Sequence, residues 1–174
     1  RKDEIDTKVK RLIQLAYYID EAKETSWNFS KHPIFKKKYS TLNNAINDYI
    51  NNLANINEEI MNLEEEVNLI FNQIYGFNPP RKLKTISKKS AFEIIEEVIS
   101  FVVGVVFNRY NVDNYELVIN NKEYVDIEII EDEIRKILTI YFGDSATKEI
   151  ETYLGKDLNS YLTNRKKIPH EESF

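Results

Sequence analysis

The chain has 174 residues, 42% of them hydrophobic, and a formal net charge of -5. This length and apolar fraction are typical of a globular protein with a substantial core. The absence of cysteine excludes disulfides and thiolate metal sites, and a content of four glycines argues against folds built on glycine-rich ligand loops. The net charge has the wrong sign for a protein that coats nucleic acid by bulk charge, so nucleic-acid contact requires local basic patches.

The sequence holds neither a run long enough to span a membrane nor a signal-peptide pattern. We therefore expect a cytoplasmic protein without a membrane partner. The sequence begins at Arg1 rather than at a methionine, so we also expect it to be a piece of a longer protein.

The first predicted element is an amphipathic helix over about residues 4–22. Its apolar side chains recur alternately after four and three residues, at Ile5, Val9, Leu12, Ala16 and Ile19. This heptad spacing places them on one stripe of a helix. A connection from about residue 20 to residue 40 follows, and its large aromatic side chains are expected to pin it onto the helix pair: Trp27, Phe29 and Phe35.

A second, much longer helix is predicted over residues 41–75. Its apolar seam also alternates between steps of four and three: Leu42, Ile46, Tyr49, Leu53, Ile56, Ile60, Leu63, Val67, Ile70 and Ile74. Polar residues fill the intervening positions, so a stripe roughly 50 Å long needs another helix along it. We expect the first helix to be this partner, antiparallel to the second. A two-chain zipper, which would make a homodimer through the seam, is the alternative.

The long helix is expected to end at Gly76, with Pro79 and Pro80 preventing its continuation. A basic linker over residues 81–89 then separates the helix-pair domain, residues 1–80, from a helical bundle over residues 90–164. Residues 165–174 are expected to be a frayed tail.

The bundle is predicted to open with Ser90 and Glu93, which are spaced as a capping box. The residues up to Phe107 become apolar on every side, as in a helix at the centre of a core, although their β-branched content also suits a buried strand. Residues 115–127 read either as a short β-hairpin or as an ordered loop. Three short helices are expected after it, at about 128–142, 145–154 and 156–163. The predicted fold is all-α: a long coiled-coil-like helix pair plus a helical bundle.

The inventory of side chains argues against catalysis. The two histidines, His32 and His170, lie in the aromatic connection and in the tail, so a histidine-based metal site or triad is not expected. The carboxylate clusters that include Glu64, Glu96 and Glu131 are each expected on the solvent-exposed face of a helix. We predict no catalytic residue and no metal ligand.

The tetrad Asn78-Pro-Pro-Arg81 resembles the Asn-Pro-Pro-Tyr motif with which amino-methyltransferases hold an extruded adenine. In that motif the aromatic residue stacks on the flipped base. Arg81 occupies its place here, and the tetrad directly follows the predicted end of a helix. We interpret it as a helix stop.

Clusters of basic residues remain as functional candidates, and one of them, Arg165, Lys166 and Lys167, lies near the end of the chain. The other two lie one on each side of the long helix: Lys36, Lys37 and Lys38, and Arg81, Lys82, Lys84, Lys88 and Lys89. Rows of cations bind the phosphates of duplex DNA, which gives affinity and registration without sequence readout. We predict DNA-backbone contact through these residues. Charge that only keeps the protein soluble is the alternative.

Four stretches carry a resemblance to a known family: Glu24-Thr-Ser-Trp-Asn-Phe29 with Pro33, Leu63 to Phe77, Ile99 to Tyr110, and Tyr153 to Leu162. In order and spacing they resemble the PglX proteins, the large adenine-specific DNA methyltransferases of BREX phage-defence systems, which are related to fused restriction–modification enzymes. The resemblance covers the chain from about Lys23 to Leu162. It departs at Asn108, where a glycine is expected, and after Leu162.

In that family these stretches follow the methyltransferase core, in the part linked to target recognition, so the resemblance transfers no catalytic residue to this chain. It implies S-adenosylmethionine-dependent N6-adenine methylation for the parent protein and no cofactor in this chain. We predict a non-catalytic helical segment, inactive alone, that acts as a spacer or supports target recognition. Its expected partners are duplex DNA and the remaining domains of the parent. The alternative is a coiled-coil interaction or dimerisation module that does not bind DNA.

Overall fold

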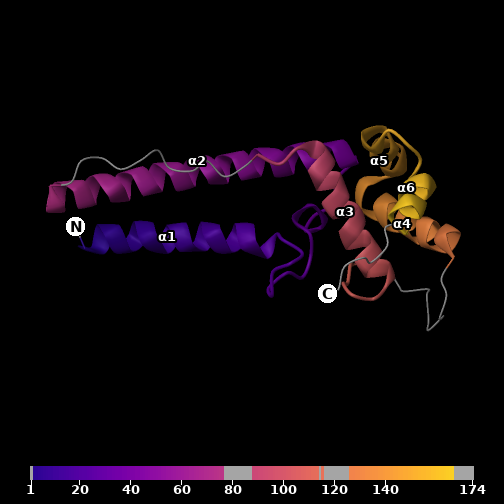
Figure 1. The fold of residues 1–174 in the computed structure, drawn as a ribbon, viewed down its shortest axis with the longest axis horizontal. Coiled ribbons are helices and arrows are strands. Elements are labelled where there is room, and N and C mark those ends of the chain that lie inside the picture. The colour runs from indigo at the N-terminus through magenta and orange to yellow at the C-terminus, as the bar shows by residue number, and fades with distance from the viewer. Residues whose placement is uncertain (1, 77–87, 114, 116–125, 167–174) are drawn as a thin grey trace, which may run out of the picture. The chain divides into compact units, whose positions relative to one another are not determined.

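The computed structural model describes residues 2–76, 88–113, 115 and 126–166, with residues 165 and 166 described by their backbone alone. Its elements in chain order are α1 (Lys2–Glu21), the short 3-10 helix η1 (Pro33–Phe35), α2 (Leu42–Tyr75), α3 (Ala91–Val106), α4 (Ile127–Phe142), α5 (Ala146–Leu154) and α6 (Leu158–Lys166) (Figure 1). The all-α prediction is confirmed, because the described residues contain no strand.

The predicted helix limits agree closely with these elements. The apolar stretch before Phe107 is a helix, α3, and the strand alternative is wrong. The end of α2 is also confirmed, because Gly76 adopts a φ of +69° and its N–H donates to the carbonyl of Asn72 at 2.8 Å. The expected hairpin near residues 115–127 and the stop at Pro79 and Pro80 lie almost wholly outside the described residues.

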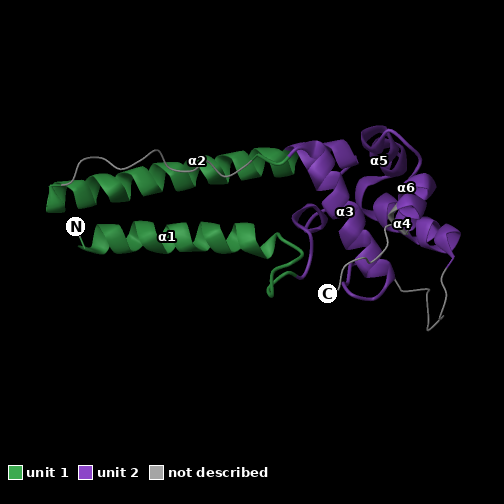
Figure 2. Cartoon of the chain, in the orientation of Figure 1, with its two compact units in different colours: residues 1–29, 48–89 green, residues 30–47, 90–174 purple. Residues whose placement is uncertain are grey.

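The chain divides into two compact units, which are described separately below (Figure 2). Unit 1 comprises Arg1–Phe29 and Asp48–Lys89, and unit 2 comprises Ser30–Asn47 and Ser90–Phe174. The first residues of α2 therefore belong to unit 2 and the rest of this helix to unit 1. Most of the linker expected over residues 81–89 lies outside the described residues.

Unit 1 is an antiparallel pair formed by α1 and α2, which lie side by side (Figure 1). Three polar contacts between the helices show that they are antiparallel. As the residue number rises along α1, the number of the contacting residue on α2 falls. Lys8 pairs with Glu66, Arg11 with Glu59 at 2.6 Å, and the side-chain amide of Asn52 donates to the hydroxyl of Tyr18 at 2.7 Å. The predicted antiparallel helix pair is therefore present within one chain.

The predicted stripe on α1 is wrong in two of its five positions. Val9 is 37% exposed and Ala16 is also exposed, whereas Leu15 is buried. The side chains that turn inward are those of Ile5, Lys8, Leu12, Leu15, Ile19 and Ala22, which are buried or half-buried. They also follow heptad spacing, but one of them is charged, so a search for apolar residues alone selects the wrong stripe. Lys8 fills its position because its aliphatic stem packs while its ammonium group meets Glu66.

The predicted seam of α2 is buried or half-buried from Leu42 to Ile70. Leu42 and Ile46 belong to unit 2 and are fully buried there. At the other end of the seam, Ile74 is 46% exposed. Because Lys8 pairs with Glu66, the first residues of α1 lie opposite the turns of α2 that come before Ile74. The prediction of a continuous buried seam therefore fails in the last turn.

Unit 2 is built around α3, whose apolar side chains are almost all buried, as are the facing residues of α4. The predicted capping box is confirmed: the Ser90 hydroxyl accepts from the Glu93 N–H at 3.2 Å, and the Ser90 N–H donates to the Glu93 carboxylate at 2.6 Å. These bonds satisfy backbone donors that the first turn of a helix otherwise leaves without partners. Sequence alone thus fixes where this central helix begins.

The other end of α3 closes in a Schellman arrangement. The N–H of Asn108 donates to the carbonyl of Val105 at 2.9 Å, and that of Arg109 to the carbonyl of Gly104 at 2.7 Å. Asn108 lies in the left-handed region with a φ of +56°, which is the conformation that glycine adopts most readily. This is the position at which the resemblance leads us to expect glycine, and asparagine tolerates the left-handed conformation better than most other residues do.

The expectation for the aromatic connection is wrong for two of its three large side chains. Trp27 is fully exposed and packs on nothing, and Phe35 is buried in unit 2 rather than against the helix pair. Phe29 is half-buried. Large aromatic residues are most often buried, and Trp27 is an exception that the sequence did not reveal.

The corrected stripe on α1 predicts different costs for two truncations. Leu15→Ala should lower the free energy of unfolding by about 2–3 kcal/mol, because it empties a buried position. Val9→Ala should lower it by less than about 1 kcal/mol, because that side chain is largely in solvent. Urea unfolding followed by circular dichroism measures both. A loss for Val9→Ala as large as that for Leu15→Ala would contradict the corrected stripe.

The left-handed conformation of Asn108 gives a second test. Asn108→Ala should destabilise the protein by about 1 kcal/mol, because alanine has no means of relieving strain at positive φ. Asn108→Gly should not destabilise it, since glycine adopts this conformation without that strain. Thermal unfolding of the two variants beside the parent chain compares them, and a stability loss in the glycine variant would contradict the assignment.

Candidate nucleic-acid interface

The first predicted cluster forms a basic loop (Lys36, Lys37 and Lys38) in unit 2, and all three of its side chains are exposed. The loop is anchored on both sides. Before it, Phe35 is buried with its ring centroid 4.9 Å from that of Phe101 and 5.1 Å from that of Phe142. After it, the N–H of Tyr39 donates to the carbonyl of Tyr141 at 3.0 Å. Three lysines are thus held on a short, fixed segment at the surface.

A further cation lies beside this loop. The ammonium group of Lys31 pairs with the carboxylate of Asp113 at 2.8 Å. The hydrogen bond from Lys31, its charge and, to a smaller extent, the charge of Lys38 lower the pKa of Asp113. Asp113 therefore lies within the electrostatic reach of cations on both sides of η1, and it stays ionised at neutral pH.

Arg109 is a second cation that the sequence analysis passed over. It is exposed and lies on the segment that joins α3 to Asp113. Neither Lys31 nor Arg109 belongs to a run of basic residues, so the sequence offers no local signal for them. The ion pair between Lys31 and Asp113, together with the bonds of Tyr141 to Asp113 and to Tyr39, holds the segment that carries Arg109 near the segment of the basic loop. We call Lys31, Lys36, Lys37, Lys38 and Arg109 the basic patch of unit 2.

The second predicted cluster is described only in part. Arg81, Lys82 and Lys84 lie outside the described residues. Lys88 is exposed, and the ammonium group of Lys89 lies 6.0 Å from the ring centroid of Tyr49. Both belong to unit 1, so the structure assigns the two predicted clusters to different units.

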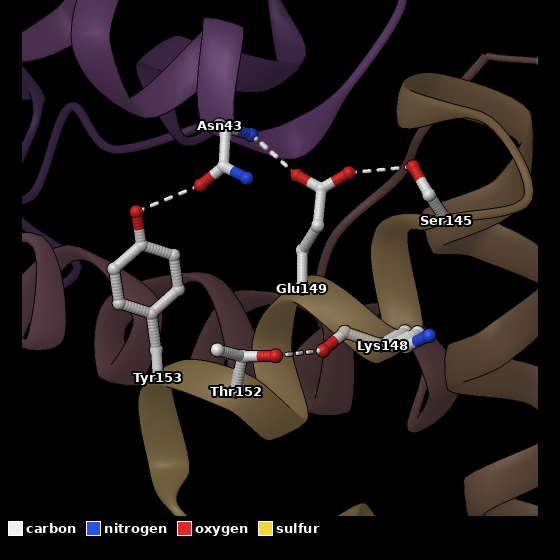
Figure 3. A pocket seen from close by; sticks show the side chains of 6 residues that line it. All are labelled: Asn43, Ser145, Lys148, Glu149, Thr152 and Tyr153. Carbon is white, nitrogen blue, oxygen red and sulfur yellow. Dashed lines mark hydrogen bonds between the residues drawn. The ribbon is translucent and has the colours of Figure 1, made fainter.

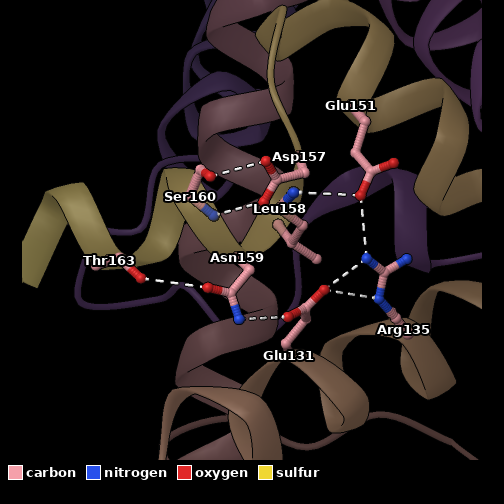
Figure 4. Close-up of polar contacts among 8 residues, drawn as sticks. All are labelled: Glu131, Arg135, Glu151, Asp157, Leu158, Asn159, Ser160 and Thr163. Carbon is pink, nitrogen blue, oxygen red and sulfur yellow. Dashed lines mark hydrogen bonds and ion pairs between the residues drawn. The ribbon is translucent and has the colours of Figure 1, made fainter.

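The prediction that the carboxylate clusters lie on solvent-exposed faces is wrong for two residues of α4. Glu131 joins α4 to α6 and is bonded to Arg135, which also reaches Glu151 of α5 at 3.0 Å (Figure 4). The amide of Asn159 donates to Glu131 at 2.8 Å, and the backbone N–H of Leu158 donates to Glu151 at 3.2 Å. These carboxylates tie three short helices together, which is a structural role.

Glu133 is only 2% exposed and is the more deeply buried of the two. Burial opposes its ionisation, but hydrogen bonds from Lys136 at 2.6 Å and from the hydroxyl of Tyr115 at 2.7 Å lower its pKa overall. Burial and the same carboxylate raise the pKa of Tyr115. The three groups hold the segment that carries Tyr115 against α4.

A pocket of about 430 Å³ lies between the start of α2 and α5, and it is lined by Asn43, Ser145, Lys148, Glu149, Thr152 and Tyr153. Most of its polar groups bind one another (Figure 3). Glu149 accepts from the backbone N–H of Asn43 at 2.7 Å and from the hydroxyl of Ser145, and the hydroxyl of Tyr153 donates to Asn43 at 2.7 Å. The arrangement fixes α5 onto the start of α2, and its hydrogen bonds have a structural role.

The ring of His32 is buried in unit 2, with its Nε2 atom 3.5 Å from the carboxylate of Glu97. His170 lies outside the described residues. The part of the chain that the structure describes holds no group of three or more histidine, aspartate or glutamate side chains placed to bind a metal ion. Of the helices described, none combines the length and apolarity that a membrane span requires.

The environment of Glu133 predicts an acid-dependent loss of stability. Because its pKa is lower in the folded state than in the unfolded state, its contribution is present above about pH 4.5 and is lost as the pH falls through the folded value. Glu133→Gln should therefore cost about 1–2 kcal/mol at pH 7 and much less at pH 3. Asp132→Asn, an exposed neighbour with the same charge change, is the control. Urea unfolding at the two pH values measures the difference, and an equal cost at both would contradict the prediction.

Comparison with known proteins gives one relative of low similarity. The chain is 25% identical to the adenine-specific methyltransferase BrxX of Escherichia coli O9:H4 (strain HS), over 68% of this chain and 12% of that protein. No family model matches the sequence, and no solved structure matches it either. The chain therefore spans about an eighth of the relative's length, and it is distantly related to a BREX-type adenine-specific methyltransferase.

Proposed function

We propose that this chain is a non-catalytic helical segment of an N6-adenine DNA methyltransferase of the PglX type, in a phage-defence or restriction–modification system. It would space or support the target-recognition part of that enzyme and contact the DNA backbone. S-adenosylmethionine and the methyl transfer belong to the parent protein in this proposal. The relation to BrxX supports the methyltransferase context, and its small share of that protein's length supports the role of one segment among several.

The basic patch of unit 2 is the observation that carries the DNA contact. The buried ring of Phe35 and the bond between Tyr39 and Tyr141 fix the backbone on both sides of three exposed lysines, so this backbone needs little further ordering on meeting phosphates. Lys31 and Arg109 add two cations, and Asp113 is the carboxylate among them. Such a patch binds phosphates with affinity but without reading bases.

The second candidate is an interaction module that does not bind DNA. It is favoured by the last turns of α2, where Phe71, Ile74 and Tyr75 are 39%, 46% and 61% exposed. A partner helix laid along this end would cover them and would continue the seam. In this reading the basic patch only keeps the protein soluble.

Fluorescence anisotropy with a labelled DNA duplex, over a series of salt concentrations, separates the two candidates. Binding whose logarithm falls linearly with log salt is expected for the first, with a slope that counts the phosphates neutralised. Replacing Lys36, Lys37 and Lys38 together by glutamine should reduce that slope by about 2–3 and weaken binding equally for different duplex sequences.

The matched control replaces three exposed lysines outside the patch, Lys2, Lys10 and Lys148, and changes the net charge by the same amount. It should leave most of the binding intact. Equal losses in both triple variants would indicate attraction by overall charge alone. No binding at low salt would leave the interaction module as the better account.

A further inference from the structure

Trp27 is the single tryptophan of the chain, and its side chain is fully exposed, at 102% of the reference value. It belongs to unit 1 and lies in the segment that follows α1. An indole group has a large apolar surface, and proteins rarely leave it wholly in water unless a partner covers it.

The exposure of Trp27 does not come from a loose loop. Three successive turns are closed by backbone bonds, from Lys23 to Asp20 at 2.9 Å, from Ser26 to Lys23 at 2.9 Å and from Phe29 to Ser26 at 3.1 Å. The hydroxyl of Ser26 also donates to the carboxylate of Asp20 at 2.8 Å. The indole is therefore presented from a folded segment, and binding a partner would require little further ordering of the backbone.

The exposed surface of α1 extends the apolar area of unit 1. Val9, Ile13 and Tyr17 recur at intervals of four and are 37%, 49% and 58% exposed. They lie away from the stripe that packs on α2, which runs through Leu12, Leu15 and Ile19. Helix α1 thus has one apolar face covered by α2 and a second one that is exposed in unit 1.

The charge around this surface indicates the kind of partner. The last turn of α1 contains Asp20 and Glu21 and no basic residue. Carboxylates at the C-terminal end of a helix meet the negative end of the helix dipole, an arrangement that is locally unfavourable. Lys23 is the one cation in this stretch, and it pairs with Asp20 at 3.6 Å. A partner with positive charge would relieve this excess, whereas the phosphates of a nucleic acid would increase it.

We propose that Tyr17, Trp27 and the carboxylates beside them form a docking surface for a basic protein segment, rich in arginine or lysine. The face of an indole binds guanidinium and ammonium groups better than the other aromatic side chains do. The aliphatic stems of such residues would cover Tyr17, and their charges would meet Glu21. This surface shares no residue with the basic patch of unit 2, and the proposal does not depend on the function proposed above.

The test uses a fluorescein-labelled hexa-arginine peptide, followed by anisotropy, and the unlabelled peptide, followed by the emission of Trp27. Because Trp27 is the single tryptophan, its emission reports on this surface directly. Saturable binding is expected for hexa-arginine and none for hexa-glutamate. Trp27→Ala and Glu21→Lys should each weaken binding about fivefold. Trp27→Ala should fold normally, since the side chain is exposed.

Glu65→Lys, an exposed charge reversal on α2 in the same unit, is the matched control and should weaken binding less than about twofold. The triple variant at Lys36, Lys37 and Lys38 should bind the peptide as the parent chain does, even where it loses DNA. Equal effects of Glu21→Lys and Glu65→Lys, or no effect of Trp27→Ala, would overturn the proposal. A change in Trp27 emission with duplex DNA and not with hexa-arginine would also overturn it, in favour of a nucleic-acid surface.

Discussion

The burial of Phe35 is the contact on which the surface of unit 2 depends. Its ring lies 4.9 to 5.1 Å, centroid to centroid, from the rings of Phe101, Tyr141 and Phe142, which come from α3 and α4. One side chain therefore connects the segment before α2 to the central helices. The basic loop follows it directly, so the position of three lysines is set by the packing of one aromatic residue. Charged side chains at a surface are positioned more precisely when the backbone that carries them is anchored by packing in the core.

The helices could be predicted because their signals are local. The capping residues Ser90 and Glu93 and the glycine at position 76 each act within a few turns of the chain, and the structure has each where the sequence predicts it. The predicted seam of α2 is buried or half-buried up to Ile70 and is exposed at Ile74. Periodicity and capping therefore determined the fold class and most helix limits.

What could not be predicted depends on contacts between distant residues. The packed stripe of α1 includes Lys8, whose place among apolar residues makes sense only once Glu66 is beside it. The burial of Glu133 needs Tyr115 and Lys136, and the placement of Lys31 needs Asp113. Single charges carry no pattern, so a reading of the sequence treats them as solvated. The prediction for Trp27 is wrong in the opposite sense, because a large apolar side chain is expected to be buried and this one is fully exposed.

The ion pairs of unit 1 have a consequence for how its two helices align. A heptad seam is compatible with several alignments, each displaced by seven residues, because the apolar positions repeat. In the observed alignment Lys8 meets Glu66 and Arg11 meets Glu59. A shift of seven residues in one direction would place Arg11 opposite Asn52, and a shift in the other would place Lys8 opposite Gln73. Each displaced alignment leaves one cation without its carboxylate. The two charged pairs therefore favour the observed register over these two alternatives, between which the apolar repeat alone does not distinguish.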